Sequence, residues 1–291
     1  MQYIQAIILG IVQGATEFLP ISSSGHLSVF QHFMGMSGSG SLMLTVFLHI
    51  GTLIAVLAVY YKTFWKLLKE IAFTIRDLFT GRLSKNNISE SRHMLYMMVV
   101  SCIPLLFLFI PIGGGRSLKD AVESLANDND IFVEGFCFFI TGILLLLGSH
   151  ASAHKANIRS RAEGKDAWWV GVAQVFAAAF PGISRSGSTI ATGMLRGVDK
   201  DYMVEYSFVL GTPAILAASV LEVKDAVGGA NLSIGLEPII VGIVTAAVFG
   251  VLAIKLLKWL VNKDKFQFFG YYCLLLSACV IAAATFEKLS V

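Results

Sequence analysis

The sequence contains little charge. Only 14% of its 291 residues are charged and 56% are hydrophobic, whereas a soluble domain carries about 25% charged residues. The mean hydropathy is +0.73. This composition excludes a disordered chain, a coiled coil and an ordinary cytosolic enzyme. It leaves a polytopic membrane protein, with room for roughly six to nine spans of about 20 residues each.

Cysteine and basic clusters are also scarce. The four cysteines show no CxxC spacing, so neither a zinc site nor a disulfide framework is indicated. The net charge is only +3 and no basic cluster has aromatic residues interleaved, so no nucleic-acid partner is expected. Lysine and arginine are absent before Lys62, and a signal peptide needs a basic start. We therefore expect the chain from Met1 onward to belong to the mature fold.

Six long apolar runs predict membrane spans, at about 42–61, 94–112, 131–149, 203–223, 238–257 and 267–286. Two further apolar stretches, 1–36 and 168–198, are interrupted by Pro20 and Pro181, each followed by serine and glycine. Proline breaks a helix, and irregular backbone at membrane depth is tolerated only inside protein or along a wet cavity. The prediction is an all-α polytopic membrane protein with six transmembrane helices and two re-entrant helix pairs.

The distribution of basic residues predicts the orientation. Segments 62–93, 150–167 and 255–265 are rich in lysine and arginine and should face the cytoplasm. Segments 113–130 and 222–237 carry more acidic than basic residues and should face outside. Every basic segment falls on the cytoplasmic side and every acidic segment on the outside when six helices cross the membrane and the two broken stretches do not.

The two broken stretches resemble each other. The run 21–25 reads Ile-Ser-Ser-Ser-Gly, the run 183–187 reads Ile-Ser-Arg-Ser-Gly, and Gly51-Thr52 is echoed by Gly211-Thr212. Each half, 1–149 and 150–291, would then contain one re-entrant pair and three spans. An odd number of spans turns the halves in opposite directions, which makes an inverted repeat within one membrane domain. The alternative is a coincidental similarity between breaks rich in proline, serine and glycine.

The first tip, residues 13–26, offers an acidic group beside a helix start. Gln13 and Glu17 share one helix face because they are four residues apart. The next half-helix begins with free backbone N–H groups, which bind anions. Its first residues are Ser22, Ser23, Ser24, Gly25 and His26.

The second tip, residues 181–189, offers a positive charge at another helix start. Arg185 is suited to bidentate phosphate binding, and it is accompanied by Ser184, Ser186, Gly187 and Thr189. Together the tips fit a phosphate or diphosphate ligand with acid–base or nucleophilic chemistry. Glu17 and Gln13 can also hold a divalent cation. The alternatives are that Glu17 is a structural counter-ion for Arg185, that the serines only cap helices, and that His26 is a core histidine.

These motifs resemble those of the bacterial undecaprenyl-diphosphate phosphatases, also called the bacitracin-resistance protein family. The first motif stands here as Gln13 to Glu17 and then Phe18 to His26, the second as Pro181 to Thr189, and a later run as Tyr206 to Pro213. The resemblance covers essentially the full length. It implies hydrolysis of undecaprenyl diphosphate to undecaprenyl phosphate and inorganic phosphate. This reaction recycles the lipid carrier of cell-wall synthesis and confers bacitracin resistance.

The resemblance also implies roles for residues. Glu17, Ser23, His26 and Arg185 would be catalytic, and Glu17 with Gln13 would hold Mg²⁺ or Ca²⁺. The substrate-binding set would be Gln13, Ser22, Ser24, Gly25, Ser184, Ser186, Gly187 and Thr189. The site would face the extracytoplasmic side of the bacterial plasma membrane, with a polyprenyl diphosphate and membrane lipids as partners. A homodimer is left open.

Two positions depart from the family pattern. Gln13 stands where the family often has Glu, and Thr45 stands where it usually has Asp or Glu. A carboxylate is therefore missing near the site, and cation dependence could differ. The residues leave open whether Ser23, His26 or a water attacks phosphorus. A transporter or flippase of a polyprenyl phosphate is the rival function, because inverted repeats also build transporters.

Overall fold

The computed structural model describes residues 2–35, 39–81, 88–113, 116–118, 131–180, 182–229 and 235–290. This part of the chain is helical apart from a short antiparallel pair, β1 (Pro111–Gly113) and β2 (Arg116–Ser117). The helices are α1 (Gln2–Phe18), α2 (Ser23–Phe33), α3 (Ser39–Val59), α4 (Tyr61–Phe79), α5 (Glu90–Cys102), the 3₁₀ helix η1 (Pro104–Phe109), α7 (Phe132–His154), α8 (Gly164–Ala179), α9 (Arg185–Leu195), α10 (Lys200–Gly229), α11 (Leu236–Asn262) and α12 (Gln267–Ser290).

Several helices are long and apolar enough to cross a membrane, so the chain is a multi-pass membrane protein. Within the described residues four segments qualify: Glu90–Phe109, Phe132–His154, Leu236–Asn262 and Gln267–Leu289. A fifth arises if the bent pair Leu44–Val59 and Tyr61–Phe79 is one span. The predicted span 203–223 lies in α10, part of whose side chains fall outside the described residues. Six spans therefore remain a prediction.

Both predicted interruptions are breaks between helices. α1 ends at Phe18 and α2 begins at Ser23, with Pro20 in the gap. α8 ends at Ala179 and α9 begins at Arg185, while Pro181 lies outside the described residues. The helices extend somewhat differently from the apolar stretches, because α8 starts at Gly164 and α2 ends at Phe33. Of the two outer acidic segments of the topology prediction, 113–130 lies largely outside the described residues. Residues 230–234 of the other segment, 222–237, and the side chains of 222–229 lie outside them as well.

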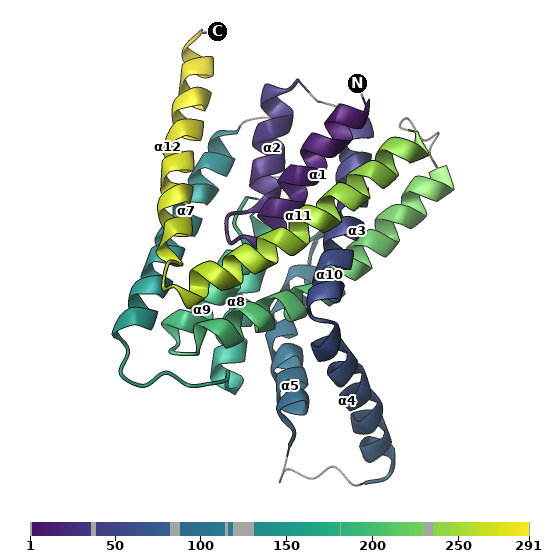
Figure 1. Ribbon diagram of the computed structural model, residues 1–291, viewed down its shortest axis with the longest axis vertical. Helices are drawn as coiled ribbons and strands as arrows, with labels where there is room; N and C mark the ends of the chain where they lie inside the picture. The colour runs from purple at the N-terminus through teal and green to yellow at the C-terminus, as the bar shows by residue number, and fades with distance from the viewer. Residues whose placement is uncertain are drawn as a thin grey trace.

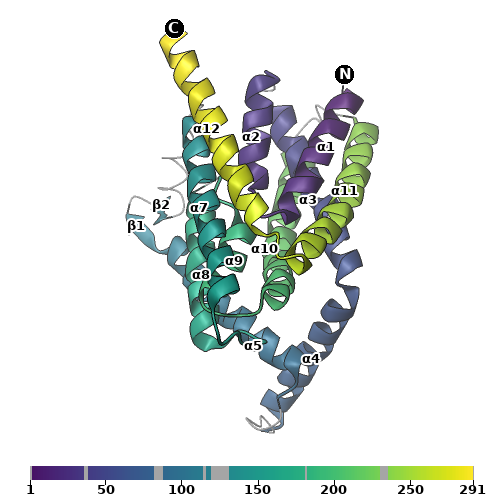
Figure 2. The ribbon, with the colours of Figure 1, turned by 60° about the vertical axis from the view of Figure 1, so that its left-hand side comes forward.

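The basic segment 62–93 contains a helix that hydropathy alone did not predict. α4 turns by 85° from α3 and exposes both apolar side chains, such as Trp65 and Leu68, and lysines. It packs against α5, where Arg92 pairs with Glu70 at 2.9 Å and with Asp77 at 3.0 Å. Figures 1 and 2 show α4 and α5 projecting together, at the end of the molecule opposite to both chain termini. Such a basic amphipathic helix is typical of a membrane surface.

Glycines allow the broken pairs to lie very close to neighbouring helices. A Cβ added at Gly14 of α1 would lie 2.4 Å from the Ala246 carbonyl oxygen of α11. One added at Gly10 would lie 2.8 Å from the Gly242 oxygen, and one at Gly171 of α8 only 2.5 Å from the Ser101 oxygen of α5. Small residues at helix contacts are the usual basis of packing within membranes. The first helix of each broken pair is thus held directly against a neighbouring helix, α11 for α1 and α5 for α8.

The close approach of α1 and α11 predicts a stability effect. We expect Gly14→Ala to destabilise the protein by about 1–3 kcal/mol, the usual cost of overpacking, because backbone atoms of α11 must move. Thermal unfolding of the detergent-purified protein measures this. Gly164→Ala is the matched control, since a Cβ there meets nothing within 4 Å. Equal melting temperatures for the two variants would contradict the packing argument.

Candidate active site

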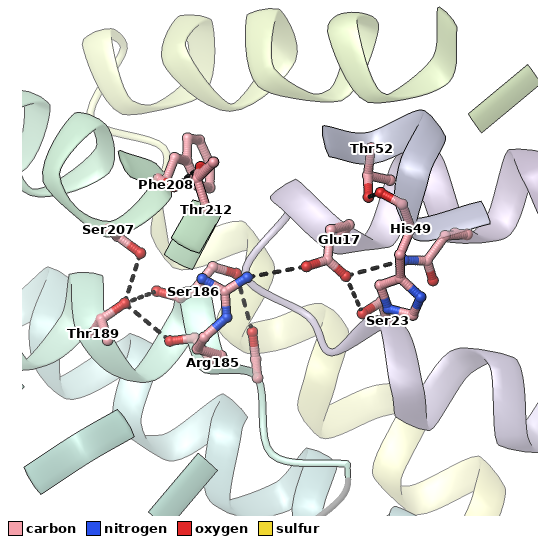
Figure 3. A network of polar contacts seen from close by, with 12 residues as sticks. Glu17, Ser23, His49, Thr52, Arg185, Ser186, Thr189, Ser207, Phe208 and Thr212 are labelled. Atoms are coloured by element: carbon pink, nitrogen blue, oxygen red, sulfur yellow. Dashed lines mark hydrogen bonds and ion pairs between the residues drawn. The ribbon is translucent and has the colours of Figure 1, made fainter. Parts of the chain in front are cut away.

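The two tips meet through an ion pair between residues 168 positions apart. Arg185 Nη2 lies 3.0 Å from Glu17 Oε1, and the Glu17 side chain is only 8% exposed. Glu17 comes from the last turn of α1, and Arg185 is the first residue of α9 (Figure 3). The structure therefore brings together the carboxylate and the guanidinium that were singled out in separate motifs.

The second oxygen of Glu17 accepts two more hydrogen bonds. Ser23 Oγ donates to Oε2 at 2.7 Å, and Gln13 Nε2 donates to the same atom at 3.1 Å. Figure 3 places the His49 side chain of α3 beside this group. A buried ion pair is tolerated only when further hydrogen bonds satisfy its remaining lone pairs. Donors from α1, α2 and α9 together meet this requirement.

The starts of α2 and α9 have matching cap hydrogen bonds, although only Ser22 has a positive φ. Ser22 is the N-cap of α2 and accepts from the Gly25 N–H at 3.2 Å, while Ser184 caps α9 and accepts from the Gly187 N–H at 3.0 Å. Each cap hydroxyl also lies 3.4 Å from a second serine hydroxyl, that of Ser24 and Ser186 respectively. Two positive helix ends are thereby placed at one location, an arrangement that favours an anion.

The two tips also interlock directly. The Gly182 N–H donates to Ser24 Oγ at 3.2 Å, and Ser186 Oγ donates to the Leu19 carbonyl oxygen at 3.5 Å. A Cβ added at Gly187 would lie 3.0 Å from the Pro20 oxygen. Gly182 has a φ of 108°, a conformation that favours glycine. The glycines therefore let one tip approach the other.

Gly211 of α10 forms the surface on which the Arg185 guanidinium lies. A Cβ added at Gly211 would fall 1.4 Å from Arg185 Nη1, so no side chain fits while Arg185 keeps this position. In the sequence, Gly211 served only as evidence for the repeat. Its counterpart Gly51 has another role, because a Cβ there would lie 2.4 Å from the Ile243 oxygen of α11.

His26 faces a different set of partners. Its Nδ1 lies 2.7 Å from the Ser22 carbonyl oxygen, and its Nε2 lies 2.8 Å from the Tyr272 hydroxyl of α12. Phe138 of α7 packs edge-on against the imidazole, with ring centroids 5.1 Å apart. The structure thus groups Glu17 with Ser23, whereas His26 is held towards α7 and α12. Tyr272 carried no signal in the sequence.

The other predicted site residues have clear positions. The Thr189 hydroxyl lies 2.6 Å from Ser207 Oγ and also donates to the Arg185 carbonyl oxygen, so it joins α9 to α10 (Figure 3). Gly25 packs against Phe138, where an added Cβ would lie 2.8 Å from the ring. Thr45, at the position of the missing carboxylate, accepts from Gln31 Nε2 at 3.1 Å. Among Thr189, Gly25 and Thr45, only Thr189 was predicted to line the phosphate pocket with its side chain.

A divalent cation fits Gln13 and Glu17 only together with other oxygen ligands. Within the described ranges no group of three His, Cys, Asp or Glu side chains is arranged to hold a metal ion. The Gln13 Oε1 atom, however, is buried without a hydrogen-bond partner, on the same amide group whose nitrogen donates to Glu17. Mg²⁺ is commonly bound by one or two protein oxygens, substrate phosphates and waters. The donor set therefore suits a cation that binds with a phosphate ligand.

Comparison with known proteins agrees with these motifs. Residues 6–279 match the family described as bacitracin resistance protein BacA. The undecaprenyl-diphosphatase of Alkaliphilus metalliredigens is 38% identical over 281 residues, which cover 97% of this chain and 98% of that protein. The protein of the same name from Halothermothrix orenii is 37% identical, over 98% of this chain and 99% of that protein. The one from Methanobrevibacter smithii is 36% identical, over 94% of this chain and 94% of that protein. The chain therefore belongs to the bacitracin resistance protein BacA family.

Proposed function

We propose that this chain hydrolyses undecaprenyl diphosphate to undecaprenyl phosphate and inorganic phosphate, and so recycles the lipid carrier of cell-wall synthesis. The observation that carries the proposal is the contact of Arg185 with Glu17 between two helix starts. The full-length relatives named undecaprenyl-diphosphatase support the same assignment. Bacitracin resistance follows from the family to which the chain belongs.

The diphosphate head is proposed to bind between the two tips, with its polyprenyl chain in the apolar surroundings of the membrane. Arg185 and the N-termini of α2 and α9 bind the phosphate oxygens. Because these groups are held in place before the substrate arrives, they stabilise the charge that develops in the transition state. Ser22, Ser24, Gly25, Ser184, Ser186 and Gly187 shape the two helix starts that surround the head.

Ser23 is the proposed nucleophile because its hydroxyl already donates to Glu17 at 2.7 Å. Ser23 Oγ forms a bond to the terminal phosphorus while the bond from that phosphorus to the bridging oxygen breaks. The serine proton passes to Glu17, and undecaprenyl phosphate leaves with the bridging oxygen. Water then attacks the phosphoserine and gives a proton to His26. Glu17 returns its proton to Ser23 as inorganic phosphate departs, and His26 releases its proton to the solvent.

A divalent cation, Mg²⁺ or Ca²⁺, is proposed to be held by Glu17 and Gln13 together with the substrate. When bound, it would neutralise part of the phosphate charge. The chain's own contribution is the Gln13 Oε1 atom, which is buried and has no partner. Because Gln13 carries no charge, the affinity for the cation rests on Glu17 and on the phosphate.

We further propose the inverted repeat, with residues 1–149 and 150–291 as its halves and α1–α2 and α8–α9 as re-entrant pairs. The matching serine caps at Ser22 and Ser184 support it. So does the packing, because α1 lies against α11 as α8 lies against α5. The basic arm of α4 and α5 opposite the termini fits a cytoplasmic position (Figure 1). The tips would then open towards the extracytoplasmic side of a bacterial plasma membrane.

Release of phosphate by the purified protein tests the function. We expect the unaltered protein to release inorganic phosphate from undecaprenyl diphosphate, and Arg185→Ala and Glu17→Gln each to lower the rate at least about 100-fold, because charge stabilisation in the transition state is lost. Arg92→Ala, which removes an arginine of the α4–α5 arm and its ion pairs with Glu70 and Asp77, should stay active. Binding without release by the unaltered protein would favour a lipid transporter. A rate near normal in either site variant would contradict the assignment of that residue.

Trapping a covalent intermediate tests the nucleophile. With substrate labelled on its terminal phosphate, acid quenching during turnover should leave label on Ser23 as phosphoserine. Ser23→Ala should remove the label, while Ser28→Ala on the same helix should keep it, since the Ser28 hydroxyl donates instead to Glu134. Label that survives only in base would indicate His26 as the nucleophile. Absence of any label would favour direct attack by water.

The contact between Gly211 and Arg185 separates activity from stability. Gly211→Ala forces the flexible guanidinium away from Glu17, so activity should fall nearly as far as in Arg185→Ala. Unpairing the buried Glu17 costs stability in both variants, but alanine is favoured over glycine within a helix by about 1 kcal/mol, so Gly211→Ala should lose less thermal stability than Arg185→Ala. Assays of phosphate release and melting temperature on the same preparation measure both effects. Full activity in Gly211→Ala would show that the guanidinium need not lie where the structure places it.

A further inference from the structure

Tyr272 links the last helix of the chain to the first tip. Its hydroxyl lies 2.8 Å from His26 Nε2, although 246 residues separate the two. The tyrosine and imidazole rings are nearly parallel, with an interplanar angle of 7° and centroids 5.8 Å apart. Phe138 packs edge-on against the imidazole. The imidazole is therefore held by one aromatic ring from α7 and one from α12.

The hydrogen bonds of His26 determine which ring nitrogen carries the proton. A backbone carbonyl oxygen can only accept, and the Ser22 oxygen lies 2.7 Å from Nδ1, so Nδ1 must bear the hydrogen. In the neutral ring Nε2 is then without a proton and accepts from the Tyr272 hydroxyl. Ser22 has a φ of 73°, a left-handed conformation that is uncommon outside glycine. This unusual backbone directs the carbonyl that fixes the tautomer.

The exposed fractions indicate how Nε2 is reached. His26 is 7% exposed, whereas Tyr272 is 42% exposed, so the phenol presents the accessible surface of the pair. Without the tyrosine hydroxyl, Nε2 would be a largely buried acceptor that has lost its partner, a condition that costs free energy. Packing alone requires only an aromatic ring at position 272, whereas the contact with Nε2 requires a hydroxyl.

We infer that Tyr272 is a positioning residue for the hydrolysis: its hydroxyl donates to the proton-free Nε2 of His26 and orients the imidazole, and it gives up this contact when Nε2 takes the proton of the attacking water. The inference rests on the proposed function, in which His26 accepts a proton from the attacking water. Groups that orient a catalytic imidazole through a hydrogen bond are a general feature of such sites. Here the orienting group is on α12, so the last helix of the chain contacts the histidine of the first tip.

Tyr272→Phe is the variant that tests the inference, because it keeps the stacked ring and removes only the hydroxyl. We expect kcat to fall about tenfold, the effect of losing one hydrogen bond, while KM stays unchanged. The melting temperature should fall by only about 2–4 °C, because the buried Nε2 atom loses its partner. Tyr271→Phe is the matched control, since Tyr271 is adjacent on α12 and 58% exposed. A variant that keeps its kcat, or one whose loss of activity lies in KM and not in kcat, would overturn the inference.

Nitrogen NMR of histidine-labelled protein provides a readout that needs no turnover. In the unaltered protein the His26 ring should show a protonated Nδ1 and an unprotonated Nε2, with the signal assigned by its loss in His26→Gln. The Nε2 resonance should shift in Tyr272→Phe and not in Tyr271→Phe. An unshifted resonance in Tyr272→Phe would overturn the inference. Failure of the unaltered protein to release phosphate would instead overturn the proposed function, and the NMR result would still decide whether Tyr272 sets the state of His26.

Discussion

The ion pair between Glu17 and Arg185 is the interaction on which the arrangement of the tips depends. Placing a carboxylate in apolar surroundings is costly unless it is paired and fully hydrogen-bonded. Glu17 meets this condition only when both tips are in place, because Ser23 and Gln13 approach from the first half of the chain and Arg185 from the second. Breaking either contact leaves a buried charge alone. The same charges that could bind and process a phosphate group therefore also favour the meeting of the two halves.

A second cluster of charges holds the far ends of α8 and α9 together. The Asp166 carboxylate, at the start of α8, pairs with Arg159 at 2.5 Å and with Arg196, at the end of α9, at 3.0 Å. Lys155 adds a hydrogen bond to the Leu195 carbonyl oxygen at 2.5 Å. These contacts join the start of α8 to the end of α9, which we call the base of the helix pair. The break between α8 and α9 lies at the other end of the pair. The position of Arg185 is thus set from both directions, by Gly211 beneath it and by the closed base of its helix pair.

Sequence patterns predicted the features whose causes are local. Proline and the serine–glycine runs end one helix and cap the next within a few residues, so the breaks and the caps at Ser22 and Ser184 could be predicted. The charge pairing of Glu17 with Arg185 was also a reasonable expectation from the repeat. Tyr272 and Gly211 could not be found in this way, because their roles depend on contacts between distant helices. α4 was missed because its alternation of lysine and apolar residues lowers the average hydropathy, although it favours an amphipathic helix.

The two tips have similar sequences but carry different chemical groups at corresponding positions. Ser23 follows the cap Ser22 in the first tip, and Arg185 follows the cap Ser184 in the second. These equivalent positions place a hydroxyl and a guanidinium on the two oxygens of one carboxylate. Glu17, three residues before Pro20, has as its counterpart Ala178, three residues before Pro181. If both tips carried an acid, two carboxylates would face each other and repel; if neither did, the guanidinium would be unpaired. A single acid between a serine hydroxyl and a guanidinium therefore requires the two halves to differ at these positions, even though the cap hydrogen bonds of the two tips match.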